Sequence, residues 1–165
     1  MYFEESNRKV KIESAVLETI KKYIQYGDRN EAGGVLLGRE ERLSKNIIVD
    51  KLTTPGPCDE RKRNSFFRKD AEHINCYEKL YYSSNMKYAY IGEWHTHHEE
   101  IPNYSKIDFD NWLIISKNDK SKNDHFHIIV GTKAIRIWKV SHKTNLAEFM
   151  VTWEWRDIDE ELLDS

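Results

Sequence analysis

The feature that most constrains the fold is a predicted strand that ends in two histidines and is followed by a predicted helix. Residues 88–94 favour a strand, and His95 and His97 come directly after it. Side chains two residues apart point to the same side of a strand, so both imidazoles can reach one ion. Ser105 begins the predicted helix, and Asp108, three residues further on, shares its helical face. We therefore expect the loop after His97 to fold Asp108 back onto the histidines.

The chemistry of these three side chains indicates a metal site. Two imidazoles and one carboxylate form a ligand set that suits Zn²⁺. Three protein ligands leave the fourth tetrahedral position for water, which distinguishes catalytic zinc sites from structural ones. The spacing of His95, His97, Ser105 and Asp108 arises by chance in about one chain in a thousand of this length. Metal binding is therefore favoured over two buried structural histidines.

The rest of the chain shows the hydrophobic periods of helices and strands. Apolar residues recur at helical spacing after Ser14, a predicted N-cap, and Gly27 is a predicted stop. Residues 31–38 (EAGGVLLG) are typical of a buried strand whose glycines let another backbone or a ligand approach closely. Together the patterns predict an α/β (α+β) fold with a mixed sheet flanked by helices. The expected elements are a helix between Ser14 and Gly27, strands at 31–38, 47–49 and 88–94, helices at 74–81 and 105–116, and antiparallel strands at 125–130, 134–140 and 147–155.

Length and composition are those of an ordinary globular domain. The 165 residues suffice for one domain with a substantial core and are too few for two. Hydrophobic residues make up 39% and charged residues 33%, typical of a soluble protein. No apolar run approaches the roughly 20 residues that span a bilayer, and residues 1–6 do not resemble a secretory signal. We expect a single cytoplasmic domain over residues 1–165, with Cys58 and Cys76 reduced and structurally incidental.

Charge is nearly balanced along the chain as a whole. The formal net charge of −2 gives no general attraction to nucleic acid or to a membrane. A basic loop is expected at about 55–69, and an acidic tail runs from Asp157 to Asp164. Solvated surface is the favoured interpretation of both. Phe66 and Phe67 are expected to anchor the basic loop. Because this loop precedes the helix that leads to the site, contact with a substrate remains an alternative interpretation.

The motif as a whole resembles the JAB/MPN (JAMM) metalloproteases. The resemblance rests on HTH, seven residues, S, two residues and D, together with the upstream EAGGVLLG strand. It implies a JAB/MPN-like fold over most of the chain, with Zn²⁺ bound by His95, His97 and Asp108. It also implies that Glu31 is the general base and that Ser105 stabilises the transition state. The usual substrates of that family are isopeptide or peptide bonds at the C-terminus of ubiquitin-like proteins.

A narrower resemblance is carried by YIGEWHTH and by the preceding TPGP and RNSFFRKD stretches. These are similar to small bacterial JAB deconjugases encoded in CBASS anti-phage operons, which remove a cGAS-like nucleotidyltransferase from its ubiquitin-like conjugates. The implied partner is therefore such a conjugate. Two positions depart from the family pattern. His98 stands where proline often follows the second histidine, and Tyr104 stands where proline often precedes the serine, with Pro102 two positions earlier. Both departures could change how the loop meets a substrate.

Several other residues have simpler interpretations. His125 and His127 form a second H-x-H, but no Ser-x-x-Asp follows, so a structural or surface role is favoured. Trp153 and Trp155 are expected to share one sheet face, in the core or at a partner surface. His98 is taken as a loop residue near the site rather than a ligand.

Two other classes of function compete with a protease. A metal-free scaffold of the MPN type would bind a partner without cleavage, but such scaffolds generally lack the ligands present here. A nucleic-acid-associated protein with a metal site needs a basic face, which the balanced charge does not favour. Catalysis also depends on Glu31 as a base. The simpler interpretation of Glu31 is an exposed carboxylate at the start of a strand. The sequence determines neither the identity of the modifier, nor the oligomeric state, nor the need for an accessory subunit.

Overall fold

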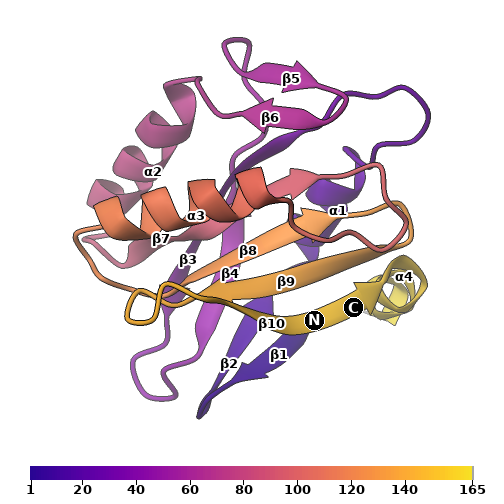
Figure 1. The fold of residues 1–165 in the computed structure, drawn as a ribbon. Helices are drawn as coiled ribbons and strands as arrows, with labels where there is room; N and C mark the ends of the chain where they lie inside the picture. Colours follow the sequence, from indigo (N-terminus) through magenta and orange to yellow (C-terminus); the bar gives the residue numbers. More distant parts are fainter. Residues whose placement is uncertain (165) are drawn as a thin grey trace.

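The computed structural model describes residues 1–164, apart from the side chain of Asp164, and is built around one mixed sheet of eight strands (Figure 1). The strand order is β1-β2-β4-β3-β7-β8-β9-β10, with β2–β4 and β7–β8 parallel. A mixed sheet with flanking helices confirms the expected fold class. The elements are β1 (Tyr2–Glu5), β2 (Arg8–Ile12), α1 (Ser14–Lys21), β3 (Gly33–Glu40), β4 (Ile47–Leu52), β5 (Glu60–Lys62), β6 (Ser65–Phe67), α2 (Glu72–Ser83), β7 (Tyr88–Thr96), α3 (Lys106–Asn118), β8 (His125–Val130), β9 (Ala134–Val140), β10 (Ala147–Glu154) and α4 (Trp155–Asp164).

The sheet is so strongly curved that its first and last strands approach each other. Phe3 on β1 packs on Phe126 of β8 and on Trp153 of β10, with ring centroids 5.7 and 6.1 Å apart. Lys139 Nζ on β9 lies 3.1 Å from a carboxylate oxygen of Glu5 on β1. Figure 1 shows the two ends of the chain close together on this side. The strands therefore wrap around a nearly closed interior.

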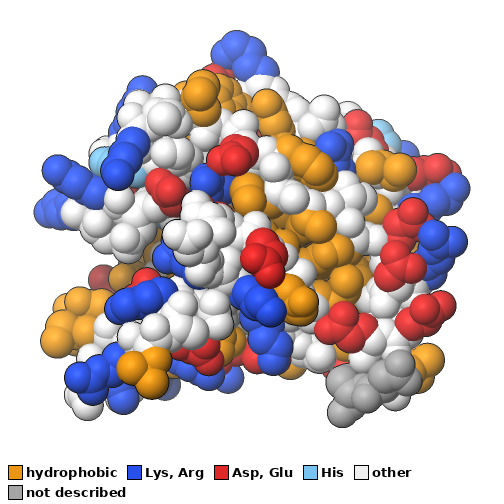
Figure 2. All heavy atoms as spheres, turned by 90° about the horizontal axis from the view of Figure 1, so that it is seen from below, with side chains coloured by type: hydrophobic (Ala, Val, Ile, Leu, Met, Phe, Trp, Pro, Cys, Tyr) orange, Lys and Arg blue, Asp and Glu red, His pale blue; other side chains and the backbone are white. Residues whose placement is uncertain are grey.

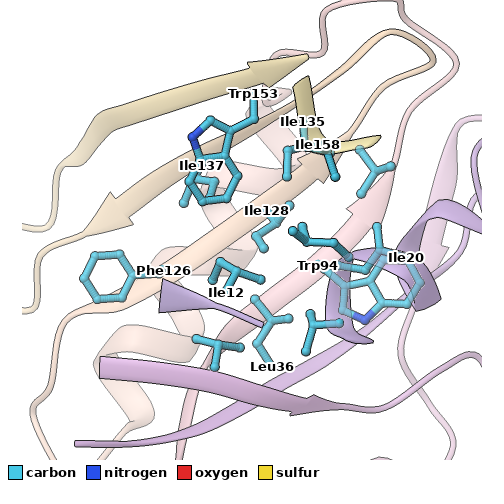
Figure 3. Packing of buried hydrophobic residues seen from close by; sticks show 14 of the residues in the cluster. Ile12, Ile20, Leu36, Trp94, Phe126, Ile128, Ile135, Ile137, Trp153 and Ile158 are labelled. Carbon is cyan, nitrogen blue, oxygen red and sulfur yellow. The ribbon is translucent and has the colours of Figure 1, made fainter. Parts of the chain in front are cut away.

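The main hydrophobic core fills the inside of the curved sheet and includes side chains from α1 and α4. Burying one large apolar side chain contributes about 1.5–3 kcal/mol to folding, so this core stabilises the curved sheet. Figure 3 shows how side chains from separate elements meet there. Its labelled members are Ile12, Ile20, Leu36, Trp94, Phe126, Ile128, Ile135, Ile137, Trp153 and Ile158.

The opposite face of the sheet is covered by α3. Successive side chains of a strand point to opposite faces, so β8 buries Ile128 in the main core and Ile129 against α3. Trp112 of α3 forms a smaller cluster with Ile129, Trp138 and Val140. Contacts of Trp112 with Ile129 on β8 and with Trp138 on β9 therefore hold α3 against this face of the sheet.

The free edge of the sheet at β10 carries exposed apolar surface. Phe149 on β10 is 48% exposed. The guanidinium of Arg136 lies over its ring and over that of Trp138, at 4.7 and 5.1 Å from the centroids. Figure 2 shows a continuous hydrophobic area on the face seen from below, with acidic and basic side chains around it. Such charges are a common way to keep a sheet edge from pairing with other chains.

The segment expected as a basic loop at about 55–69 contains the β5–β6 hairpin, whose strands are too short to show a hydrophobic period. A buried row of three side chains anchors its base. Thr53 Oγ1 lies 2.5 Å from His73 Nδ1, and His73 Nε2 lies 2.8 Å from Asp59 Oδ2. Three backbone amides also donate to Asp59. Burial opposes ionisation of Asp59, but these hydrogen bonds outweigh it and lower its pKa.

Replacing His73 with alanine is expected to lower the free energy of unfolding by about 2–3 kcal/mol, because the ionised Asp59 loses a hydrogen bond in a buried place. Urea denaturation followed by circular dichroism measures the change. Asn75→Ala, at an exposed position of the same helix, is the control and is expected to stay within about 0.5 kcal/mol of wild type. Equal stabilities of His73→Ala and the control would contradict the anchoring role.

Three expectations about single residues are wrong in detail. The N-cap of α1 is Glu13 rather than Ser14, and the helix ends at Lys21, with Lys22 as its C-cap, rather than at Gly27. Glu13 keeps an extended backbone, with φ −70° and ψ 150°, and its N–H donates to Val49 O at 3.0 Å, so the chain is still paired with β4 there. Trp155 does not share a sheet face with Trp153, because β10 ends at Glu154 and Trp155 begins α4.

The predicted acidic tail is a helix, α4, rather than a solvated extension. Trp155 and Ile158 are buried in the main core, and their spacing of three residues was hidden among acidic neighbours in the sequence. The amino group of Met1 lies 2.5 Å from Glu161. The tail is therefore docked against the start of the chain. The side chain of Asp164, the last acidic residue of the prediction, lies outside the described residues.

Two further expectations concern the thiols and the membrane. Cys58 and Cys76 are both free, which agrees with the expectation of reduced, unpaired cysteines. Within residues 1–164, no helix is long and apolar enough to cross a membrane.

Candidate metal centre

β7 delivers two histidines to the face of the sheet that α3 covers. The strand continues to Thr96, beyond its expected end, so His95 belongs to it and pairs with Gly33 of β3. Thr96 is fully buried between the two histidines. The His97 N–H donates to Val130 O at 2.9 Å, which continues the pairing with β8. The alternation of a strand thus places both imidazoles on one side.

α3 begins with a capping box that orients Asp108. Ser105 is the N-cap residue, and its Oγ accepts a hydrogen bond from the Asp108 N–H at 3.2 Å. In return the Ser105 N–H donates to Asp108 Oδ2 at 2.6 Å. The pair satisfies two backbone donors that a helix start would leave free and holds the carboxylate in one orientation. The helix itself starts at Lys106, one residue later than predicted.

His95, His97 and Asp108 form one compact group of possible metal ligands. His95 Nε2 and His97 Nε2 are 3.1 Å apart. The carboxylate oxygens of Asp108 lie 3.2 Å from His95 Nε2 and 3.5 Å from His97 Nε2. One ligand atom from each residue lies within 4.8 Å of the others. Two nitrogens and one oxygen that converge in this way fit a zinc ion with an open coordination position.

The charges of these three side chains depend on one another. Burial opposes ionisation of Asp108, but hydrogen bonds with His95 and His97 outweigh it and hold its pKa far below the usual value. Burial also opposes protonation of His97, but Asp108, with smaller contributions from Glu31 and Glu99, outweighs this effect and raises the pKa of His97. A metal bound here competes with a proton for His97, so metal affinity falls as the pH falls.

Glu31 lies in the same pocket and is 5% exposed, so it is not an exposed carboxylate at a strand start. Its N–H donates to Lys62 O at 2.8 Å, and Arg61 Nε donates to Glu31 O at 2.8 Å. Burial raises the pKa of Glu31 to about 7, while His97 opposes the shift and Asp108 adds to it. A carboxyl group with such a pKa can take up and release a proton near neutral pH.

One buried amide ties the segment before Glu31 to the hairpin and to β7. Gln25 is 2% exposed, and its Nε2 donates to Arg29 O at 2.9 Å and to Arg63 O at 3.0 Å. Its Oε1 accepts a hydrogen bond from Thr96 Oγ1 at 3.2 Å. A single side chain therefore connects the three segments that surround the Glu31 backbone.

The five residues singled out from the sequence line one pocket of about 240 Å³ between α3, β7 and the β5–β6 hairpin. Phe66 forms part of its wall and packs closely on Gly33, where an added Cβ would lie 2.6 Å from the ring. Ile107, 60% exposed, also lines the pocket. The pocket thus combines polar side chains with apolar ones. Its remaining lining residues are Asn64, Ser65, Phe67, Glu93, Trp94, His98, Glu99, Asn111 and Trp112.

Sequence reasoning missed Glu99. Its Oε2 lies 3.2 Å from His97 Nδ1 and accepts a hydrogen bond from the Asn103 N–H at 3.0 Å. Because an ionised carboxylate can only accept, His97 Nδ1 carries the hydrogen when the ring is neutral, and Nε2 then offers its lone pair to a metal. The H-x-E spacing was visible in the sequence, but the loop that turns Glu99 back was not. His98, by contrast, lines the pocket without joining the three-residue group.

The second histidine pair lies beneath α3. His125 and His127 are fully buried, and His125 Nε2 lies 2.7 Å from Asp119. The ring of His127 stacks on Trp112, with centroids 4.6 Å apart and planes at 9°. Its Nδ1 accepts a hydrogen bond from the Glu93 N–H. These contacts place α3 on the sheet, in agreement with the structural role favoured from the sequence.

A curved mixed sheet, two strand histidines, an aspartate in a helix cap and a buried glutamate together define a JAB-type domain. Residues 13–142 match the family described as prokaryotic homologs of the JAB domain. The chain belongs to this family, as the resemblance of its motif indicated.

Three bacterial relatives share one name, CD-NTase/cGAS isopeptidase. The chain is 31% identical to the protein from Escherichia coli over 140 residues, which cover 84% of this chain and 86% of that protein. It is 32% identical to the protein from Pseudomonas aeruginosa, over 74% of this chain and 77% of that protein. With the protein from Vibrio cholerae it shares 33% identity over 62% of this chain and 63% of that protein. The narrower resemblance noted in the sequence therefore agrees with these relatives.

A solved structure supports the fold. The solution structure of protein DSY2949 from Desulfitobacterium hafniense matches with a TM-score of 0.61, over 85% of this chain and 88% of that protein. The sequence identity is 13%. At this identity the likeness concerns the arrangement of the sheet and helices alone.

Proposed function

We propose that this chain is a zinc-dependent isopeptidase or peptidase that cleaves after the C-terminus of a ubiquitin-like modifier. Its substrate would be a conjugate of that modifier with a cGAS-like nucleotidyltransferase, in the cytoplasm, during bacterial defence against phage. The observation that carries the proposal is the single pocket in which Glu31 lies beside three possible metal ligands. The names of the three relatives support the substrate class. Residues 1–165 would act as one JAB-type domain.

His95, His97 and Asp108 would hold the zinc ion. Their two imidazole nitrogens and one carboxylate oxygen are ligands that zinc prefers, and they leave one position open. When bound, zinc supplies Lewis-acid polarisation and lowers the pKa of water toward neutrality. The capping box with Ser105 holds Asp108 in place, and Glu99 holds the ring of His97.

Glu31 would serve as the general base. Its carboxylate takes a proton from the attacking water, whose oxygen bonds to the carbon of the scissile carbonyl. The same carboxyl group returns the proton to the leaving amine when the C–N bond breaks, so no covalent intermediate with the protein is needed. A pKa raised by burial suits both steps, because the group must take and release a proton near neutral pH.

Ser105 would stabilise the negative charge that develops on the carbonyl oxygen. Its Oγ accepts a hydrogen bond from the Asp108 N–H, so its own hydrogen is free to donate into the pocket. Loss of one such donor typically lowers the rate by about 10²–10³-fold.

Zinc content and cleavage test the proposal together. Elemental analysis should find about one zinc per chain, as expected for a three-ligand catalytic site. Cleavage of a conjugate between a ubiquitin-like protein and a CD-NTase should stop on chelation and return when zinc is added. Bound zinc without cleavage would reject the substrate while retaining the site. A chain that binds no zinc would reject the proposal as a whole.

Glu99→Gln is expected to weaken zinc affinity by about 10–100-fold, because the neutral amide orients the His97 ring less strongly than the carboxylate. Competition with a chromophoric chelator measures the dissociation constant. The matched control is Glu100→Gln, since that side chain is exposed and pairs with Lys133 at 2.8 Å. The control should retain wild-type affinity. Equal affinities of the two variants would show that Glu99 does not position His97.

A further inference from the structure

A second pocket adjoins the Glu31 segment outside the candidate metal centre. It has a volume of about 360 Å³ and is lined by Lys22, Tyr23, Arg29, Asn30 and Arg61. The lining contains three cationic side chains and no carboxylate. None of these residues belongs to the pocket with the metal ligands. The feature that requires an explanation is this concentration of positive charge on a chain of nearly balanced charge.

Three separate segments bring these cations together. Lys22 is the C-cap of α1, Arg29 belongs to the loop that leads to β3, and Arg61 lies in β5. In the described part of the chain, none of the three has a carboxylate oxygen within 4.0 Å. Arg63, at the hairpin turn, does have such a partner, because its Nη1 lies 3.0 Å from Asp28. The three cations of the pocket therefore lack an acidic partner, whereas the neighbouring Arg63 has one.

Backbone carbonyls orient both guanidinium groups. Arg61 donates from Nε to Glu31 O at 2.8 Å and from Nη2 to Asn30 O at 3.5 Å. Arg29 donates from Nη1 to Ile24 O at 3.3 Å. Neutral acceptors restrain a guanidinium without cancelling its formal charge, and they leave its other N–H groups free. The pocket is therefore both positive and organised in advance of binding.

The negative end of α1 does not neutralise the pocket. A helix C-terminus carries roughly half a negative charge, spread over its last carbonyls. Arg29 faces this region, because its Nη1 donates to the carbonyl oxygen of the C-cap residue Lys22 at 3.5 Å. Lys22 and Arg61 remain as further positive charges, and like charges in one pocket repel one another until an anion lies between them. Anion binding would relieve this repulsion.

We propose that this pocket binds the phosphate group of a small phosphate-bearing molecule through Lys22, Arg29 and Arg61. A guanidinium matches two phosphate oxygens at once, and a lysine ammonium adds a point charge. A phosphate dianion presents more oxygens and more charge than one carboxylate, so it suits three cations better. Inorganic phosphate and a nucleoside triphosphate share this chemistry, and the experiment separates them.

Arg61 also connects this pocket to the candidate metal centre. The same guanidinium that lines the pocket donates to the backbone oxygen of Glu31. An anion held by Arg61 restrains that contact and, with it, the backbone that carries the Glu31 carboxylate. An effect of phosphate on cleavage rests on the proposed function, whereas the binding itself does not.

Isothermal titration calorimetry of the 165-residue chain with inorganic phosphate and with ATP tests the pocket. Saturable binding at one site is expected, weakened about tenfold by Arg29→Gln through loss of a charge-assisted contact. Lys22→Gln repeats the test without removing the hydrogen bonds of Arg29 to its loop. Lys62→Gln is the control, because Lys62 is exposed on the same hairpin but does not line the pocket. It should change the affinity by less than about twofold, as a screened surface charge does.

The outcomes separate the possible ligands. Tighter binding of ATP than of phosphate supports a nucleotide, and equal binding supports a single phosphate group. Absence of saturable binding, or equal weakening by Arg29→Gln and Lys62→Gln, would overturn the proposal. An acidic peptide without phosphate that binds as tightly, with the same sensitivity to Arg29→Gln, would overturn it too. Calorimetry does not depend on cleavage, so failure of this pocket and failure of the isopeptidase activity are distinguishable.

Discussion

Replacing Glu31 with glutamine is expected to leave zinc bound and to lower the cleavage rate by about 10²–10⁴-fold. The amide has nearly the shape of the carboxyl group but cannot take a proton from water. Glu31 is not one of the three possible ligands, so the variant should keep the zinc content of wild type. Zinc content and kcat, measured on the same preparations, check both parts.

A matched control and a pH profile sharpen this result. Glu18→Gln removes an exposed carboxylate from α1 and should leave the rate unchanged. Burial raises the pKa of Glu31 to about 7, so wild-type cleavage should rise with pH as the carboxylate forms. A bound cation shifts this rise to lower pH, because positive charge favours the ionised form. Wild-type activity of Glu31→Gln would contradict the role of Glu31 as the base.

Asp108→Asn is expected to lose zinc and cleavage together. The loss of affinity should exceed the roughly 10–100-fold that removal of an outer hydrogen-bond partner causes, because the charged ligand itself is removed. Asparagine keeps the size of the side chain and an oxygen that can accept from the Ser105 N–H, so the start of α3 is preserved. Elemental analysis after dialysis, followed by the cleavage assay, measures both effects.

Asp110→Asn controls for the loss of a carboxylate from the same helix. Asp110 pairs with Lys106 at 2.5 Å, and both side chains are at least half exposed. This variant should keep one zinc per chain and the wild-type rate. Chelation of wild type should reproduce the Asp108→Asn result. Retention of zinc by Asp108→Asn would show that Asp108 is not a ligand.

The strand–loop–helix that holds the metal centre was predictable because its geometry is local. His95 and His97 share a side through the two-residue period of a strand, and Asp108 follows Ser105 by one helical turn. The structure brings all three side chains together, as that spacing predicted. The central strand at β3 and the three final strands were predictable for the same reason, since each is a continuous or alternating apolar run.

Other parts of the site depend on segments that lie far apart in the sequence. The burial that raises the pKa of Glu31 comes from the β5–β6 hairpin and β7, about 30 and 60 residues away. The hairpin itself shows no hydrophobic period, because each of its strands has only three residues. Its base is anchored by His73 and Asp59, and its Phe66 packs on Gly33. The contact of Glu99 with His97 requires a loop conformation that no local pattern indicates.

The C-terminal end of the chain shows the same difference between what local patterns predict and what tertiary contacts decide. Trp155 and Ile158 were expected in a strand and an acidic tail, but they enter the core from α4. This helix depends on tertiary packing, because Trp155 and Ile158 are buried against the interior of the curved sheet. The sequence by itself determined the fold class, the family and the ligand spacing, because periodicity and short motifs act within one or two elements. Only the tertiary structure decided the burial of Glu31, the partner of His97 and the shape of the pocket, because these depend on desolvation and on contacts between distant segments.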